Sequence, residues 1–151
     1  MMPLTEETDK TLPFTLVTTD WQTHQRALSE IRRKVFIEEQ QVPEALEWDG
    51  EDADAIHLLA FDLGGEPIAC ARLLYDGRLG RMAVLPAFRG HGVGMALLEQ
   101  AIALFREQCF EAVTLSAQTH AIGFYAQAGF RVCSEIYDDA GIPHRDMVLT
   151  L

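Results

Sequence analysis

The 151-residue sequence lacks any apolar run of 18 or more residues and any segment typical of a secretory signal peptide. We therefore expect no membrane-spanning helix and no export. Only three cysteines are present, Cys70, Cys109 and Cys133, and their spacing is not that of zinc ligands or of a complete disulfide framework. The sequence predicts a protein of the reducing cytoplasm with buried, reduced thiols and no metal.

Basic residues are scarce, because 12 lysines and arginines stand against 23 acidic residues, for a formal net charge of −11. Such a chain repels phosphate backbones and anionic lipids, so neither a nucleic acid nor a membrane is expected as a partner. The long-range field favours a cationic or amine substrate, although a local basic cluster could still bind one small anion. Apolar residues make up 48% of the sequence, which excludes wholesale disorder.

The length predicts one domain, at residues 13–151, after a flexible lead-in at residues 1–12. The segment at residues 39–55 contains Pro43 and Gly50 and is too broken for regular structure, which indicates a functional or mobile loop whose charges are mostly solvated. Periodicity predicts helices at 23–38, from the RGHGVG segment onward for about four turns, and at 121–128. Apolar and β-branched runs bounded by turns predict strands at 14–18, 56–62, 67–75, 78–84, 112–117, 131–136 and 147–151, the last two around a turn. This order is that of an α+β domain with helices covering a curved sheet.

Residues 89–94, RGHGVG, alternate three glycines with other residues just before a long apolar helix. Glycine lets the backbone approach a ligand, and the free N–H groups and positive dipole end of a helix bind phosphate or pyrophosphate. Arg89 adds a permanent cation with forked donors. The spacing differs from the dinucleotide motif and from the P-loop, which disfavours NAD and nucleoside triphosphates. The simpler alternative is a glycine-rich turn that only starts a helix.

Two segments together resemble the signatures of the GNAT acetyltransferases. Residues 80–94, GRMAVLPAFRGHGVG, resemble the signature R/Q-x-x-G-x-G/A and its flanks, and residues 121–130, AIGFYAQAGF, resemble A-x-x-[FL]-Y-x-x-x-G-F. The resemblance covers residues 14–151 and implies the GNAT fold, a central, mostly antiparallel curved sheet flanked by helices. Stretches at residues 33–40, 47–52, 115–118 and 141–144 narrow it to the ElaA/YjcF-like branch, which has no agreed substrate.

The resemblance implies acetyl-CoA as the donor and an amine as the acceptor. The loop from Arg89 to Gly94 would hold the pyrophosphate, and the strand backbone at residues 82–84 the pantetheine arm. Gln118 departs from the family pattern, in which asparagine is frequent seven residues before the tyrosine. Dimers are frequent among related proteins, so a homodimer is compatible with the resemblance, but the sequence does not determine the oligomeric state. The implied cofactor-binding residues are Met82, Ala83, Val84, Arg89, Gly90, His91, Gly92, Val93, Gly94, Gln118 and Tyr125.

Acetyl transfer from a thioester needs a neutral amine, a stabilised oxyanion and a proton for the leaving thiolate. By the resemblance, the Val84 N–H polarises the thioester carbonyl and the Tyr125 hydroxyl donates to sulfur. The alternative for Tyr125 is a core aromatic whose hydroxyl meets a polar partner. An amine with a pKa of about 10.4 must first lose a proton to a base. The candidate bases are Glu39, Asp49, His57 and His120, with His144 a weaker one; solvated carboxylates and structural histidines are the alternative.

Two other functions stay open. Acyl-homoserine-lactone synthases have a related fold and a pattern resembling Arg32 or Arg33, Phe36, Trp48 and the acids at 49–54, but they lack a good R-x-x-G-x-G loop. A non-catalytic CoA-binding module would keep the fold without turnover, against which Tyr125 and several candidate bases argue. The sequence therefore favours an N-acetyltransferase that uses acetyl-CoA and a primary amine of a small molecule.

Overall fold

The computed structural model describes residues 14–151. The predicted lead-in at residues 1–12 lies outside the described residues and stays a prediction. The predicted succession of strands and helices is confirmed, with short elements added. The elements are β1 (Phe14–Thr19), α2 (Trp21–Arg32), η1 (Arg33–Glu39), α3 (Glu44–Glu47), β2 (Ile56–Asp62), β3 (Pro67–Leu73), β4 (Arg78–Val84), η2 (Pro86–Phe88), α4 (Val93–Glu107), β5 (Ala112–Gln118), η3 (Thr119–Ala121), α5 (Ile122–Ala126), β6 (Arg131–Val132), β7 (Tyr137–Asp139) and β8 (Ile142–Thr150).

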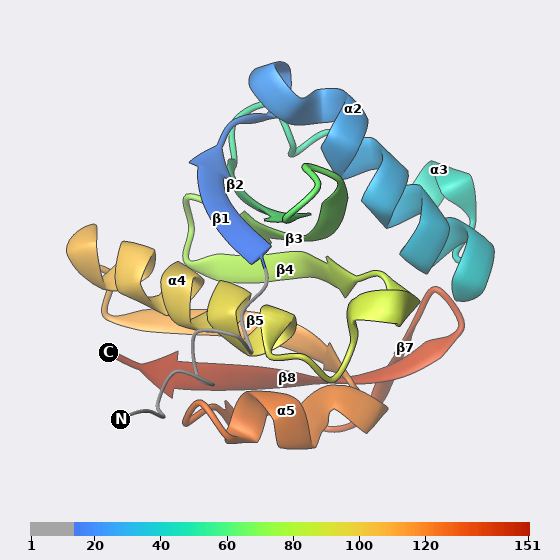
Figure 1. Ribbon diagram of the computed structural model, residues 1–151. Helices are drawn as coiled ribbons and strands as arrows, with labels where there is room; N and C mark the ends of the chain where they lie inside the picture. The colour runs from blue at the N-terminus through green and yellow to red at the C-terminus, as the bar shows by residue number, and fades with distance from the viewer. Residues whose placement is uncertain (1–13) are drawn as a thin grey trace, which may run out of the picture.

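The described strands form one sheet in the order β1-β2-β3-β4-β5-β8-β6, with β7 paired to β8 (Figure 1). Neighbouring strands are antiparallel except β4 and β5, which are parallel. These two strands pair only at Arg78 with Thr114 and at Leu79 with Leu115, and they then separate (Figure 1). The C-terminal halves of β4 and β5 therefore have facing edges that are not bonded to each other.

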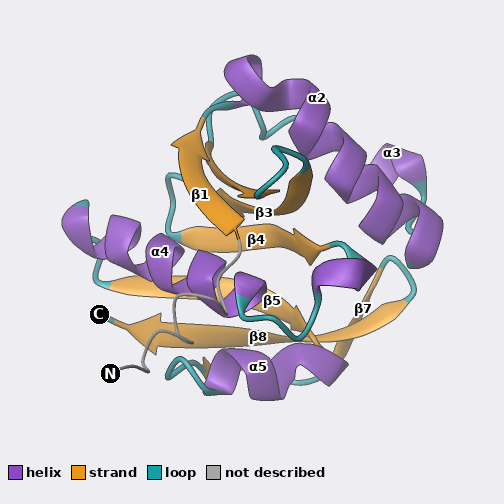
Figure 2. Ribbon diagram, in the orientation of Figure 1, coloured by secondary structure: helices purple, strands orange, loops and turns teal. Residues whose placement is uncertain are grey.

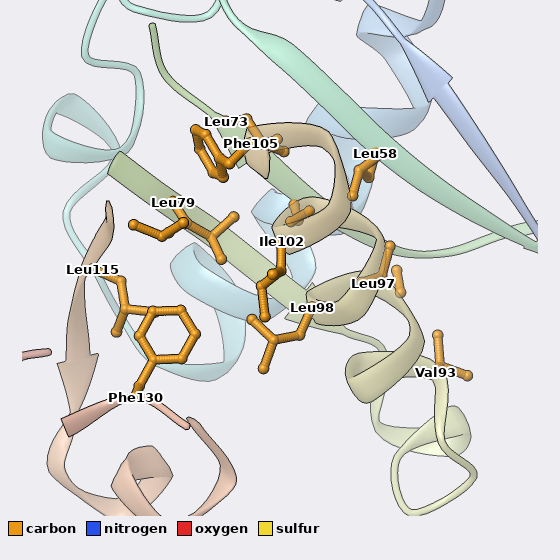
Figure 3. Close-up of a cluster of buried hydrophobic side chains, with 14 of the residues drawn as sticks. Leu58, Leu73, Leu79, Val93, Leu97, Leu98, Ile102, Phe105, Leu115 and Phe130 are labelled. Atoms are coloured by element: carbon orange, nitrogen blue, oxygen red, sulfur yellow. The ribbon is translucent and has the colours of Figure 1, made fainter. Parts of the chain in front are cut away.

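Helices pack on both faces of the sheet (Figure 2). On one face, α4 buries Leu97, Leu98 and neighbouring side chains against β2, β3, β4 and β5, as Figure 3 shows. On the other face, α2 packs its apolar stripe against Leu59 and Cys70. Burying a leucine side chain contributes about 1.5–3 kcal/mol, so these two clusters hold the helices to the sheet.

Helix α2 begins earlier than predicted because Asp20 caps it. The Thr23 N–H donates to Asp20 Oδ1 at 2.7 Å, which satisfies one of the free donors of the first turn. The predicted apolar stripe is confirmed, since Leu28, Ile31 and Val35 are buried. From Arg33 onward the helix widens to a π-helix, in which the Gln40 N–H reaches back five residues to the Val35 carbonyl at 3.1 Å.

The segment at residues 39–55 is more ordered than predicted. It contains the single helical turn α3, and Glu47 and Asp52 are only 3% and 6% exposed. The prediction of mostly solvated charges is wrong for these two acids, because arginines from α2 and β3 pair with them.

The C-terminal strands also have other bounds than predicted. Strand β6 covers only two residues, while β7 and β8 form a hairpin where the sequence indicated a turn. Ala140 and Gly141 have φ values of 56° and 82°, the pattern of a two-residue hairpin turn, which extends β8 backward. Among the cysteines, Cys70 is buried but Cys109 and Cys133 are exposed, so the prediction of three buried thiols is wrong for two of them.

Between residues 14 and 151, no helix has the length and apolar character needed to cross a bilayer.

Candidate active site

A cleft of about 1670 Å³ includes the facing edges of β4 and β5. Its walls come from η1, α3, β4, the RGHGVG loop, β5, α5, β7 and β8, which are far apart in the sequence. The cleft forms at this place because parallel pairing of β4 with β5 stops after two residue pairs. Of the predicted site residues, it brings together Glu39, Asp49, Met82, Ala83, Val84, Arg89, Gly90, Gly92, Gly94, Gln118 and Tyr125.

The backbone of β4 presents polar groups to this cleft. The Leu85 N–H donates to the Ile68 carbonyl of β3 at 2.9 Å. Because successive backbone N–H groups alternate between the two edges of a strand, the Val84 N–H points to the opposite edge, where β5 has separated. The Val84 carbonyl on this edge accepts a hydrogen bond from Arg89 Nε at 2.8 Å. The edge of β4 at Val84 thus offers an N–H donor to a ligand in the cleft.

The glycine loop leads directly into α4. Gly90 and Gly92 have φ values of 81° and 84°, which only glycine adopts without strain. Helix α4 follows with 15 residues, and the N–H groups of its first turn have no partners within the helix. A Cβ on Gly94 would lie 3.3 Å from the Phe124 ring, so glycine here lets the helix approach α5 closely.

Two residues of the predicted loop, His91 and Val93, do not line the cleft with their side chains. His91 is exposed and Val93 is buried in the core. Only their backbone N–H groups are therefore suited to contact a ligand at this loop.

Arg89 is held by an ion pair with Glu39. Its Nη1 and Nη2 donate to the two carboxylate oxygens at 2.8 and 2.7 Å, and the two side chains are 42% and 41% exposed. The hydrogen bonds from Arg89 lower the pKa of Glu39, which keeps Glu39 ionised at neutral pH. Glu39 therefore lies beside the cation that the sequence predicts to bind pyrophosphate.

Tyr125 extends from α5 into the cleft with its ring against Phe124 and Phe130, at centroid distances of 5.0 and 6.0 Å. Burial raises the pKa of Tyr125 to about 12, so the phenol keeps its proton at neutral pH. The hydroxyl donates to the Met82 Sδ at 3.9 Å. A thioether is a weak acceptor, so a stronger acceptor in the cleft would take this hydrogen bond.

A buried ion network that the sequence did not predict lies beside the cleft, centred on Arg32. This side chain is 1% exposed, and its guanidinium donates to Glu47 Oε2 at 2.8 Å and to Asp52 Oδ1 at 2.6 Å. The guanidinium also lies over the rings of Trp21 and Trp48, at 5.5 and 5.1 Å from their centroids. Arg32 thereby fastens residues 47–52 to α2.

Asp49 belongs to the same network. Both of its oxygens accept hydrogen bonds from Arg72 at 2.9 Å, and Arg81 Nη2 donates to Oδ2 at 3.2 Å. Partial burial raises the pKa of Asp49, but the hydrogen bonds from Arg72 and the positive charges outweigh it and lower the pKa to about 2. A carboxylate bound by two arginines is a poor proton acceptor.

His57 lies beneath α2 and does not line the cleft. It is buried, its Nε2 lies 3.0 Å from the Asp52 carbonyl oxygen, and burial lowers its pKa. The structure therefore does not bring His57 to the other predicted site residues. His120 and His144 do line the cleft, although the sequence ranked His144 lowest.

Sequence reasoning missed the polar wall that β5 gives to the cleft. Val113, Leu115 and Ala117 are buried, and the alternate residues Thr114, Ser116 and Gln118 present polar side chains to the cleft. Gln118 also exchanges side-chain hydrogen bonds with Gln40, at 2.9 and 3.3 Å. The alternation in AVTLSAQ was the signal that could have revealed this wall.

The sequence of this chain is similar to those of acetyltransferases. The model of the acetyltransferase (GNAT) domain matches residues 18–151. The uncharacterized N-acetyltransferase YjcF of Bacillus subtilis is 38% identical over 78% of this chain and 86% of its own length. The protein ElaA of Escherichia coli is 34% identical over 80% of this chain and 84% of its own length.

Solved structures give the same result. The crystal structure of E. coli ElaA aligns with a TM-score of 0.80 and 30% identity, over 89% of this chain and 98% of that one. An acyl-CoA N-acyltransferase from Pseudomonas aeruginosa aligns with a TM-score of 0.80 and 32% identity, over the same shares of the two chains.

Proposed function

Because the chain belongs to the GNAT acetyltransferase family, in its ElaA/YjcF-like branch, we propose that it transfers the acetyl group of acetyl-CoA to a primary amine of a small molecule. A CoA-linked acyl donor is what the fold of this family implies. The observation that carries the finer proposal is the convergence of the Val84 backbone edge, the glycine loop and Tyr125 on one cleft.

The donor would lie along β4 and the start of α4. Arg89 and the backbone N–H groups of residues 90–94 would bind the pyrophosphate, as free donors at a helix N-terminus favour an anion. The backbone of Met82, Ala83 and Val84 would bind the pantetheine arm at the edge that β5 leaves open. Because Arg89 already holds Glu39, the pyrophosphate must compete with that carboxylate for the guanidinium.

Two groups would serve the acyl transfer. The Val84 N–H would donate a hydrogen bond to the thioester oxygen, where negative charge develops as the amine attacks. The Tyr125 hydroxyl would exchange its hydrogen bond to Met82 Sδ for one to the leaving sulfur. Its pKa of about 12 exceeds that of a typical thiol, so Tyr125 stabilises the leaving thiolate mainly as a hydrogen-bond donor.

The predicted bases differ in how far their contacts support that role. Glu39 holds Arg89 and Asp49 holds Arg72 and Arg81, contacts that support donor-site and structural roles. His57 does not line the cleft. Glu39 and Asp49 are therefore less able to accept a proton than free carboxylates, and His57 is not placed to contact an acceptor in the cleft.

Thermal unfolding with acetyl-CoA tests donor binding, with NADH and ATP as ligand controls and Arg89→Glu as the site variant. A ligand at 100 times its Kd adds about 2.7 kcal/mol to the free energy of unfolding, which shifts Tm by several degrees. A shift confined to CoA compounds and lost in Arg89→Glu is expected. The absence of any shift at saturating acetyl-CoA would refute the proposal.

Turnover separates the remaining alternatives. Release of the free CoA thiol is followed with spermidine, histamine, glucosamine and lysine as acceptors. Binding of acetyl-CoA without thiol release would favour a non-catalytic CoA-binding module. Transfer only from an acyl carrier protein would favour an acyl-homoserine-lactone synthase instead.

A further inference from the structure

The strands β5, β7 and β8 form a continuous polar wall along the cleft. In the β-sheet register, Ser116 of β5 lies opposite Asp146 of β8, and Gln118 lies opposite His144. On the other edge of β8, Tyr137 of β7 lies opposite the same His144. Paired residues of neighbouring strands share one face of a sheet, and all five side chains line the cleft. We call these five residues the β5–β8 wall.

Three residues of this wall, Ser116, Tyr137 and Asp146, are joined by hydrogen bonds. Tyr137 Oη donates to Asp146 Oδ1 at 2.5 Å and also contacts the Ser116 hydroxyl. No arginine or lysine among the described residues forms an ion pair with Asp146, in contrast to Glu39 and Asp49. The Asp146 carboxyl group is therefore open to a cation that enters the cleft.

His144 has the geometry of a positioned proton acceptor. Its Nδ1 lies 2.7 Å from the Ile142 carbonyl oxygen, and because a carbonyl only accepts, Nδ1 carries the hydrogen. In the neutral ring, Nε2 is then the acceptor. The ring stacks on Tyr137 at 6.1 Å and 23°, which fixes its plane.

The Nε2 atom of His144 remains accessible although the residue is only 8% exposed. Within residues 14–151, no hydrogen bond engages this atom, yet it is not among the solvent-inaccessible side-chain nitrogens that lack a hydrogen bond, which are the Nε atoms of Arg72 and Arg81. Nε2 therefore reaches the cleft. The residue opposite His144 on β5 is Gln118, which lies in the part of β5 that has separated from β4.

The other predicted bases that line the cleft lack this combination. Glu39 and Asp49 are bound by arginines, and His120 is exposed, with no hydrogen bond from residues 14–151 to hold its ring. From this contrast we propose that His144 is the catalytic base that deprotonates the acceptor, and that Asp146 with Tyr137 and Ser116 binds the acceptor as a primary ammonium ion. The inference rests on the proposed acetyl transfer.

The protons balance in the following way. The ammonium group gives one proton to His144 Nε2, and the neutral nitrogen forms a bond to the thioester carbon as the carbon–sulfur bond breaks. The nitrogen loses its second proton to solvent, and the thiolate, stabilised by the hydrogen bond from Tyr125, takes up one proton to leave as the CoA thiol. The imidazolium of His144 releases its proton to water, so one amide, one thiol and one proton result.

The test compares two substitutions of His144 with a matched control. In His144→Asn, the amide nitrogen can still donate to the Ile142 carbonyl, but no base remains. In His144→Gln, the side-chain amide extends toward the position of Nε2 but is not a base. This substitution serves as the second variant if His144→Asn does not fold. His24→Asn is the control, because His24 of α2 is also held through Nδ1, by Thr19 at 2.6 Å, and does not line the cleft.

The kcat is measured by CoA thiol release with the best acceptor among spermidine, histamine, glucosamine and lysine. Acetyl-CoA hydrolysis without an amine and the Kd of acetyl-CoA are measured in parallel. Loss of a general base lowers kcat by about 10²–10⁴-fold, so both His144 variants should show this loss with an unchanged Kd for acetyl-CoA. Asp146→Asn should instead raise the KM of the acceptor by about tenfold with a smaller change in kcat.

Each other outcome overturns the inference. A kcat within threefold of wild type in a folded His144 variant refutes the base, while the proposed acetyl transfer stands. An equal loss in His24→Asn shows a general effect on the fold rather than proton transfer. If wild type binds acetyl-CoA but neither acetylates an amine nor hydrolyses the thioester, the proposed function itself fails, and this inference fails with it.

Discussion

The ion pair between Arg89 and Glu39 predicts opposite effects for substitution of its two partners on donor affinity. Both carboxylate oxygens of Glu39 engage the guanidinium that is proposed to bind the pyrophosphate. Binding of the donor therefore requires Arg89 to leave this carboxylate or to share its donors. Removing the carboxylate should tighten donor binding, whereas removing the guanidinium should weaken it.

The size of each effect follows from the exposure of the pair. An exposed ion pair contributes about 0.2–1 kcal/mol, so Glu39→Gln should lower the Kd of acetyl-CoA by up to about fivefold. A hydrogen bond to a charged group contributes about 1.5–3 kcal/mol, so Arg89→Gln should raise the Kd by about 10–150-fold. If Glu39 is not the base, Glu39→Gln leaves kcat within about threefold.

Isothermal titration with acetyl-CoA measures both effects, and Glu38→Gln is the matched control. Glu38 is the exposed neighbour of Glu39 on η1 and does not line the cleft, so its substitution changes the charge without the contact to Arg89. The gain in Glu39→Gln should shrink at about 1 M salt, where exposed charges are screened within about 3 Å. Weaker donor binding in Glu39→Gln, or an equal gain in Glu38→Gln, would refute the reasoning.

Three further predictions concern catalysis, folding and pH. Tyr125→Phe should lower kcat by about 10–100-fold with an unchanged Kd for acetyl-CoA, and wild-type turnover with chemistry rate-limiting would contradict the role of its hydroxyl. Arg32→Met removes the buried cation that Glu47 and Asp52 share and leaves each of them one arginine partner, Arg81 and Arg72 respectively. The substitution should cost about 3 kcal/mol, the low end for a broken buried ion pair, and lower Tm by roughly 6–12 °C in calorimetry; an unchanged Tm would show that the network is not needed. The pKa of Asp49 falls from 3.8 to about 2 on folding, so its ionisation contributes up to about 2 kcal/mol to the free energy of unfolding. This contribution is present above about pH 4 and is lost as the pH falls from about 4 to about 2. Urea titrations over this range should show a smaller loss of stability in Asp49→Asn than in wild type.

The local elements of the fold were largely predictable from sequence. Apolar spacing places Leu28, Ile31 and Val35 on the buried stripe of α2 and η1, and apolar runs bounded by glycine turns place β2, β3 and β4 nearly where the structure has them. These features depend on residues close in sequence, which is why periodicity reports them. The hairpin of β7 and β8 was missed because the two positive φ values at Ala140 and Gly141 do not appear in an apolar pattern.

The site was predictable in part, because its donor half lies in contiguous segments. The glycine loop, the adjoining edge of β4 and Tyr125 are each marked by a local motif, and they line one cleft. No such motif marks the acceptor half. His144 ranked lowest among the candidate bases because nothing in the sequence shows that β8 places it opposite Gln118.

By itself, therefore, the sequence determined the order of the elements, the family and the residues of the glycine loop, all of which depend on short-range patterns. Only the tertiary structure decided which charges are paired. It placed Asp49 on two arginines and Glu39 on Arg89, and it brought Asp146 and His144 to the cleft, where no arginine or lysine of residues 14–151 pairs with Asp146. The physical reason is that pairing depends on strand register and on the place where β4 and β5 separate, and both are set by packing across the whole sheet.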